Sequence, residues 1–218
     1  KELVFRFYPF VAEKPFHVIE HGRDLTAYRP CASPVTDPPI RVVYFGALNR
    51  AKGTHLVEAL MRINQEERGP FEFHILGATS REFNPSQYGG IVHGPYDRED
   101  LPQKLVKIAP SLSLVPSIWP ETYCHALTES WAAGIPVLAS DIGVLRERVQ
   151  RHGGGWCLDH TDPVRWYQRM VEIVTTPGEW ERRREEIQAM TFPTIRDMAA
   201  QYMSVYAPLL QAERSGRG

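Results

Sequence analysis

The chain has few cysteines, no long hydrophobic run and almost no net charge. Its 218 residues include only three cysteines, with no Cys-x-x-Cys pair, and the odd number argues against a disulfide scaffold. No stretch of about 18 apolar residues and no signal-peptide pattern occurs, so we expect a cytoplasmic protein. The formal net charge of −1 provides no basic field for nucleic acid, which we exclude as a partner.

Familiar metal and phosphate motifs are also absent. His17 and His21 are four residues apart, but residues 16–19 read as extended and Gly22 follows at once, so we predict no metal site there. The turn after residues 41–45 matches neither the Gly-x-Gly-x-x-Gly pattern nor a P-loop. These absences predict no bound metal and disfavour a nicotinamide dinucleotide.

Short apolar runs alternate with helix-like segments along most of the chain. The runs cover residues 41–45, 71–76, 90–93, 112–115, 136–140 and 156–158. The helix-like segments cover residues 54–66, 97–108 with Asp97 as its N-cap, 124–133, 144–150, 163–175, 179–190 and 194–209. Because several runs are apolar throughout, we expect parallel strands covered on both faces. The sequence thus predicts an α/β fold, a Rossmann-like doubly wound parallel sheet, with ligands at the carboxyl ends of its strands.

Both ends of the chain read differently from its middle. Residues 1–39 hold two candidate strands, at 3–10 and 16–19, and a Pro-rich stretch typical of a linker. We interpret them as the remnant of an N-terminal domain with an interdomain linker. A domain at 40–192 and a C-terminal helix with a tail at 193–218 follow. Because the first residue is not Met, we expect an excised piece of a longer protein.

The most informative stretch is the strand–loop–helix–strand unit at 111–149. Glu121 precedes its helix and Glu129 lies eight residues later, which corresponds to about 12 Å of rise and roughly 80° of rotation. This separation suits a hydrolytic carboxylate pair poorly. It suits two contacts to one elongated ligand whose phosphate lies at the helix start. Spacing alone leaves open that Glu121 complements the helix dipole and Glu129 is solvated.

Several motifs occur in a characteristic order and spacing. They are Phe-Gly-x-Leu-x-x-x-Lys-Gly at 45–53, Leu76-Gly77, His93-Gly94-Pro95-Tyr96, Pro-Ser-x-x-Pro-Glu-x7-Glu at 116–129, and Ala-Ala-Gly-Ile-Pro-Val-Leu-Ala-Ser-Asp at 132–141. Together they resemble the retaining GT-B glycosyltransferases of family four (group 1), from about His17 to the last helix. The doubly acidic motif with its Gly-x-Pro-Val strand is the most specific.

The resemblance implies a C-terminal, donor-binding domain that uses a UDP-, GDP- or dTDP-linked sugar without a cofactor or metal. Glu121 would be the catalytic residue, contacting the donor sugar and steadying charge at its anomeric carbon, and Glu129 would hold the ribose hydroxyls. Lys52 would face the diphosphate, with Arg50 as a second cation because many relatives have Arg or Ser where Ala47 stands. Further donor-binding positions would be Gly46, Gly77, His93, Gly94, Thr122, Tyr123, Cys124 and His125. We predict that Trp131 and Met198 belong to the core and that Cys124 is buried and no nucleophile, because no partnered base is evident.

The resemblance also implies a glycan or lipid-linked acceptor, held by an N-terminal domain, in bacterial surface polysaccharide synthesis. The full-length protein would then work in the cytoplasm, with possible peripheral association at the inner face of the membrane. This chain alone is expected to bind nucleotide and to transfer little or no sugar. Two alternatives stay open: a non-catalytic nucleotide-sugar-binding module, which Ala47 favours, and a GT-B-type sugar-nucleotide 2-epimerase.

Overall fold

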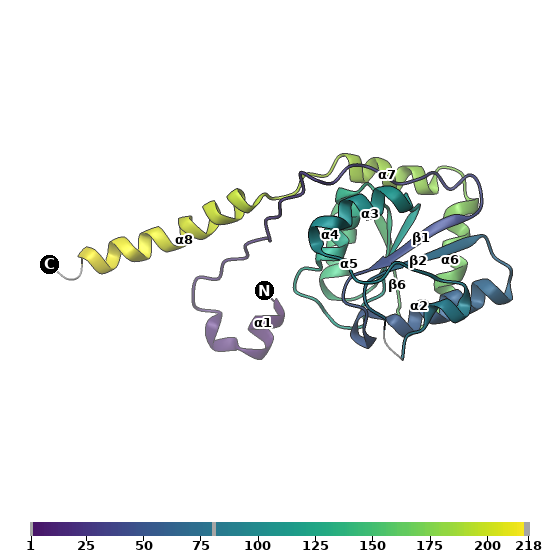
Figure 1. Cartoon of the computed structure of the whole chain (residues 1–218). Helices are drawn as coiled ribbons and strands as arrows, with labels where there is room; N and C mark the ends of the chain where they lie inside the picture. The colour runs from purple at the N-terminus through teal and green to yellow at the C-terminus, as the bar shows by residue number, and fades with distance from the viewer. Residues whose placement is uncertain (1, 80–81, 216–218) are drawn as a thin grey trace. The chain divides into compact units, whose positions relative to one another are not determined.

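The computed structural model describes residues 2–79 and 82–215 and divides into two compact units (Figure 1). The larger unit runs from Leu25 to Met190. The smaller unit combines the residues up to Asp24 with those from Thr191 onward. The predicted tail includes residues 216–218, which lie outside the described residues.

A six-stranded parallel sheet forms the centre of the larger unit. Its strands are β1 (Ile40–Phe45), β2 (Phe71–Leu76), β3 (Ile91–Val92), β4 (Leu112–Val115), β5 (Val137–Ser140) and β6 (Gly155–Leu158). All neighbours pair in parallel in the order β3-β2-β1-β4-β5-β6. This is the strand order of a doubly wound Rossmann sheet, so the predicted fold class is confirmed.

Helices cover both faces of this sheet. They are α2 (Thr54–Glu66), α3 (Leu101–Ile108), α4 (His125–Ala132), α5 (Gly143–His152), α6 (Pro163–Thr175) and α7 (Glu179–Gln188). Figure 1 shows α3, α4 and α5 on one side of the strands and α2 and α6 on the other. Short 3-10 helices connect them: η2 (Arg50–Lys52), η3 (Pro85–Tyr88) and η4 (Arg98–Asp100).

The core follows from the apolar strands and from three buried tryptophans. Every residue of β4 and β5 is buried, as expected for strands covered on two faces. Trp131, Trp166 and Trp180 are each at most 2% exposed. Their indole N–H groups donate to backbone carbonyls at 2.7–3.0 Å, so their burial leaves no indole donor unpaired. The prediction that Trp131 belongs to the core is confirmed.

The Pro-rich residues 25–39 belong to the larger unit and not to a separate linker. The Cys31 backbone N–H donates to the Ala133 carbonyl at 2.9 Å. The Ser111 hydroxyl donates to the Pro34 carbonyl at 3.3 Å. The unit therefore begins at Leu25, earlier than the predicted residue 40, because backbone hydrogen bonds fasten this segment to the sheet and its helices.

The helix predicted at 97–108 with Asp97 as its N-cap forms differently. The 3-10 helix η4 comes first, and the Asp97 side chain makes no capping hydrogen bond. The α-helix α3 begins at Leu101, with Pro102 in its first turn. Proline suits that turn because its missing N–H would have no helical partner there, so the proline marks the start of α3.

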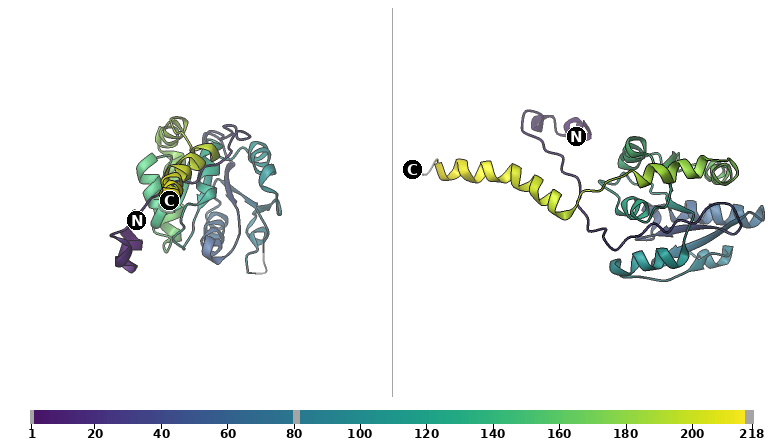
Figure 2. Two further views of the ribbon diagram at one scale, coloured as in Figure 1. Left: turned by 90° about the vertical axis from the view of Figure 1, so that its left-hand side faces the viewer. Right: turned by 90° about the horizontal axis from the view of Figure 1, so that it is seen from above.

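The smaller unit corrects two strand predictions. Residues 3–10 fall in α1 (Glu2–Phe7) and η1 (Pro9–Val11), and residues 16–19 form no regular element. Short apolar runs do not distinguish strand from helix by periodicity alone. The helix α8 (Ile195–Ser215) extends beyond the predicted 209 and continues through Pro208, and Figure 2 shows it as one continuous helix. Met198, predicted as core, is only half-buried.

Candidate functional site

A cavity of about 450 Å³ opens at the carboxyl ends of β1, β2 and β4. The chain segments that follow these strands line it, together with the first half of α4. β1 and β4 are neighbours in the sheet, and the strand order reverses between them. A doubly wound sheet binds its ligands at such a switch point, so this cavity is the candidate site.

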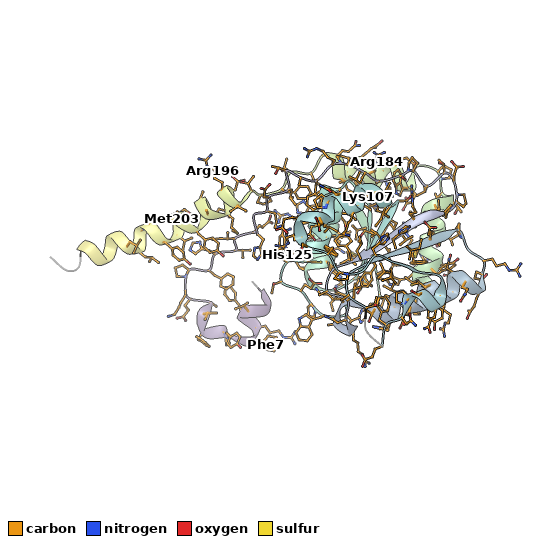
Figure 3. The ribbon with its side chains drawn as sticks, in the orientation of Figure 1. Phe7, Lys107, His125, Arg184, Arg196 and Met203 are labelled. Atoms are coloured by element: carbon orange, nitrogen blue, oxygen red, sulfur yellow. The ribbon has the colours of Figure 1, made fainter. Side chains whose placement is uncertain are left out.

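Seven of the predicted site residues line this one cavity. They are Gly46, Lys52, Gly77, Glu121, Cys124, His125 and Glu129. Glu121 and Glu129 therefore face the same space, one before α4 and one inside it. His125, at the start of the same helix, is labelled in Figure 3. The arrangement allows one ligand to contact both carboxylates.

The other five predicted site residues do not line the cavity. Arg50 and Thr122 are exposed to solvent. The Gly94 carbonyl accepts a hydrogen bond from the Gly77 N–H at 2.9 Å, so Gly94 helps to position Gly77, which lines the cavity. The His93 ring stacks on His74, with Nε2 at 2.9 Å from His74 Nδ1. The remaining residue, Tyr123, packs under the guanidinium of a helix α5 arginine.

Lys52 and Glu121, predicted to contact different parts of a ligand, are paired with each other. Lys52 Nζ lies 2.8 Å from Glu121 Oε1, and the Ser117 hydroxyl donates to the same oxygen at 2.5 Å. Burial alone would raise the pKa of Glu121. The hydrogen bonds from Lys52 and Ser117 and the lysine charge outweigh it, so the pKa lies below its ordinary value. Glu121 is thus an anion whose charge Lys52 balances.

Backbone contacts hold Lys52 in this place from several directions. Its own N–H donates to the Asn49 side chain at 3.1 Å, and its carbonyl accepts the Tyr44 hydroxyl at 2.9 Å. Gly53 follows with φ +77°, and a Cβ there would lie 1.9 Å from the Pro116 carbonyl oxygen. Only glycine allows both the left-handed turn and this close approach. The turn before α2 is therefore pressed against the end of β4.

Glu129 is buried inside α4 at 6% exposure, yet one side of it faces the cavity. Arg98 Nε lies 3.8 Å from its Oε1, and the arginine itself is 61% exposed. Burial, and then the nearby Glu129 charge, raise the pKa of Tyr96 to about 12, so this phenol is a neutral hydrogen-bond donor. Tyr96 and Ser117 belong to the His93-Gly94-Pro95-Tyr96 and Pro-Ser motifs without having been assigned a role, whereas Arg98 lies in no motif.

The backbone at the start of α4 has an unusual conformation. Cys124 has φ +66° and ψ +91°, values that a residue with a Cβ adopts at a cost. Its thiol is buried, and burial raises its pKa to about 12. Cys124 is therefore a neutral thiol and no nucleophile, as predicted. The start of a helix carries the positive end of the helix dipole, which favours an anionic group there.

No group of three His, Cys, Asp or Glu side chains within residues 2–79 and 82–215 could hold a metal ion. The same described residues contain no helix long and apolar enough to cross a lipid bilayer. Metal independence stays a prediction.

The sheet order and the cavity at its switch point define a nucleotide-binding type of α/β domain. Residues 32–190 match the family model described as glycosyl transferases group 1, and the chain belongs to this family. The fold is that of the C-terminal, Rossmann-like domain of GT-B glycosyltransferases. A search of the curated proteins found no match.

Solved structures from three organisms are similar to this chain. Sucrose-phosphate synthase from Thermosynechococcus elongatus has a TM-score of 0.74 at 22% identity, over 97% of this chain and 56% of that one. HepE from Anabaena, in complex with UDP and glucose, has a TM-score of 0.69 at 18% identity, over 88% of this chain and 56% of that one. The C-terminal domain of LpcC from Francisella tularensis has a TM-score of 0.59 at 15% identity, over 77% of this chain and 93% of that one. The chain thus spans little more than half of the first two proteins.

Proposed function

We propose that the larger unit binds the donor of a retaining, metal-independent glycosyltransferase that uses a nucleotide-activated sugar. One observation carries this proposal: Glu121 and Glu129 line one cavity on either side of the α4 start. A ligand with hydroxyl groups at both ends and phosphates between them fits that layout. Membership of the glycosyl transferase group 1 family supports it, as does the solved complex of HepE with UDP-glucose.

Each side chain of the cavity has a role in this proposal. Glu121 accepts hydroxyls of the donor sugar, and Glu129 accepts those of the ribose. Lys52 faces the diphosphate, together with backbone amides at the start of α4. The base lies toward Gly77, Ala78 and Pro95 at the far wall of the cavity. Arg50 is exposed, so we assign it a weaker role in phosphate binding than Lys52.

The ion pair between Lys52 and Glu121 implies an order of steps for donor binding. Lys52 leaves Glu121 and pairs with the diphosphate, and Glu121 is then free to accept a sugar hydroxyl. During transfer the bond between the anomeric carbon and the phosphate oxygen breaks. The acceptor oxygen bonds to the same face of that carbon, and its proton goes to the leaving phosphate. Lys52 and the amides stabilise the charge on that phosphate.

The acceptor and the pathway belong to the same proposal. We assign a glycan or lipid-linked acceptor in bacterial surface polysaccharide synthesis, bound by an N-terminal domain, with peripheral membrane association of the full-length protein. Motif similarity is the support for these assignments. The present chain is expected to bind the nucleotide and to transfer little or no sugar, because this cavity holds only the donor side of the reaction.

Calorimetric titration of the chain with UDP, GDP and dTDP tests the donor site. At least one of them is expected to bind, without a change on addition of a metal chelator. Glu129→Ala should weaken that binding about 10-fold or more, because it removes a charged hydrogen-bond acceptor. Glu147→Ala is the matched control, since this exposed carboxylate lies on α5 outside the cavity. Failure of all three nucleotides to bind would overturn the proposal.

A non-catalytic nucleotide-sugar-binding module is a second candidate. Ala47 lines the cavity and brings no charge to it, while Arg50 is outside the lining. The phosphate site therefore has fewer cations than the family pattern implies. An assay of donor hydrolysis and sugar transfer by the full-length protein separates the two functions. Product formed from the sugar nucleotide without acceptor would instead indicate a 2-epimerase.

A further inference from the structure

Arg148 on α5 holds the loop before α4 although it does not line the cavity. Its Nη1 donates to the carbonyl of Tyr123 at 2.7 Å and to that of Cys124 at 3.2 Å. Its Nη2 donates to the Thr128 hydroxyl at 2.8 Å. Its guanidinium also lies 4.3 Å from the centre of the Tyr123 ring. One side chain thus joins α5 to two consecutive peptide groups.

These contacts determine the direction of the amides on the opposite side. In a trans peptide the carbonyl and the following N–H point in opposite directions. With the carbonyls of Tyr123 and Cys124 turned to Arg148, the N–H groups of Cys124 and His125 point away from it. Consecutive carbonyls of an extended chain alternate in direction, and the φ of +66° at Cys124 removes that alternation. Two successive amides pointing one way form a concavity that binds anions.

Cys124 and His125 both line the cavity that Glu121 and Glu129 share. We propose that Arg148 is a positioning residue for the diphosphate of the ligand. It orients two consecutive peptide groups so that the N–H groups of Cys124 and His125 can donate hydrogen bonds to phosphate oxygens. This inference rests on the proposed donor site and adds to it a residue outside the cavity.

A packing role alone would make a different prediction. Arg148 also lies 5.2 Å from the Trp131 ring centre, so its removal will lower stability in either case. Only the positioning role predicts a loss confined to the phosphate part of a ligand. The base is assigned to Gly77, Ala78 and Pro95 and the ribose to Glu129. Arg148 donates to none of these residues, so nucleoside binding should be unaffected.

The test compares diphosphate and nucleoside binding by calorimetry on the whole chain. UDP, GDP and dTDP are titrated first, and each is paired with its nucleoside. Arg148→Leu is expected to weaken diphosphate binding about 10-fold or more, while nucleoside binding changes by less than about 2-fold. Arg148→Lys should show the same selective loss to a smaller degree, because one ammonium does not hold both carbonyls. Arg146→Leu is the control, since Arg146 lies on the same helix and pairs with Asp141.

A second measurement covers the case in which Arg148→Leu does not fold. In the unchanged ¹⁵N-labelled chain, the amide resonances of Cys124 and His125 should shift on addition of the diphosphate, and in Arg148→Lys they should shift less. Equal diphosphate affinity in Arg148→Leu and the unchanged chain, or equal losses for diphosphate and nucleoside, would overturn the inference alone. If no diphosphate binds the unchanged chain, the proposed function fails and the inference fails with it.

Discussion

Replacing Glu121 by Gln is expected to strengthen the binding of a free nucleoside diphosphate, although Glu121 is the proposed catalytic residue. Lys52 Nζ lies 2.8 Å from Glu121 Oε1. Lys52 must leave this partner before it can pair with a phosphate. The substituted glutamine would keep the size of the side chain and remove the charge, so the lysine would be released at less cost.

The exposure of the two side chains sets the size of the effect. Lys52 is 36% exposed and Glu121 13%, so the pair is intermediate between a solvated and a buried one. Fully exposed pairs contribute about 0.2–1 kcal/mol, and we take about 1 kcal/mol here after allowing for solvent screening. Glu121→Gln should then bind UDP about 5-fold more tightly. Lys52→Met loses a charged hydrogen bond to phosphate of about 1.5–3 kcal/mol but no longer has to break the ion pair. It should therefore bind UDP about 2- to 30-fold more weakly.

Calorimetry with UDP and with UDP-glucose, or with the nucleotide that the chain prefers, measures both variants and the double variant. UDP-glucose should not show this increase in affinity for Glu121→Gln, because its sugar no longer has a carboxylate to contact. Lys107→Met is the control, an exposed lysine on α3 outside the cavity (Figure 3). Weaker UDP binding by Glu121→Gln, or unchanged binding by Lys52→Met, would refute the proposed exchange of partners.

Three further predictions concern stability and are measured by urea unfolding. Gly53→Ala should lose more than about 2 kcal/mol, since φ +77° disfavours a Cβ that would lie 1.9 Å from the Pro116 oxygen; an unchanged midpoint would contradict this. Trp131→Phe should lose about 1–3 kcal/mol, because the Gly154 carbonyl keeps only the Val137 N–H as donor and the smaller ring leaves a void in the core; a neutral effect would contradict this. The lowered pKa of Glu121 stabilises the fold above its ordinary value of 4.5 and stops doing so as the pH falls through the folded pKa. The stability difference from Glu121→Gln should therefore shrink as the pH falls below 4.5, and a growing difference would show the opposite shift.

The sheet could be predicted because its strands carry a strong and simple signal. β2 and β4 match the predicted ranges, and both are mainly apolar and followed by glycine or proline. Such a strand is buried whichever elements pack against it. Residues 3–10 gave a similar signal and form a helix, since hydrophobicity without a period carries no information on backbone conformation. In that segment the hydrophobic pattern was the only clue.

The candidate site could be predicted in part for a related reason. Glu121 and Glu129 lie within one short unit, so the loop before α4 and the first turns of that helix bring both to the same cavity. The partners of these carboxylates come from elsewhere in the chain: Lys52 from the turn before α2 and Arg98 from η4. Pairs between distant segments depend on how the elements pack, which no local spacing encodes. Arg148 is of the same kind, because its contacts lie 20 to 25 residues away.

The two ion pairs together indicate which ligand the cavity prefers. Glu121 is neutralised by Lys52 and Glu129 approaches Arg98, so both carboxylates of the cavity have a cation beside them that reduces the repulsion of an anion. A phosphate that took Lys52 alone would leave Glu121, 13% exposed, charged and without its strongest partner, which costs free energy. A ligand that also brings hydroxyl groups to both carboxylates removes that cost. The pairing therefore favours a nucleotide-sugar over inorganic phosphate, which offers charge without hydroxyls at the required separation.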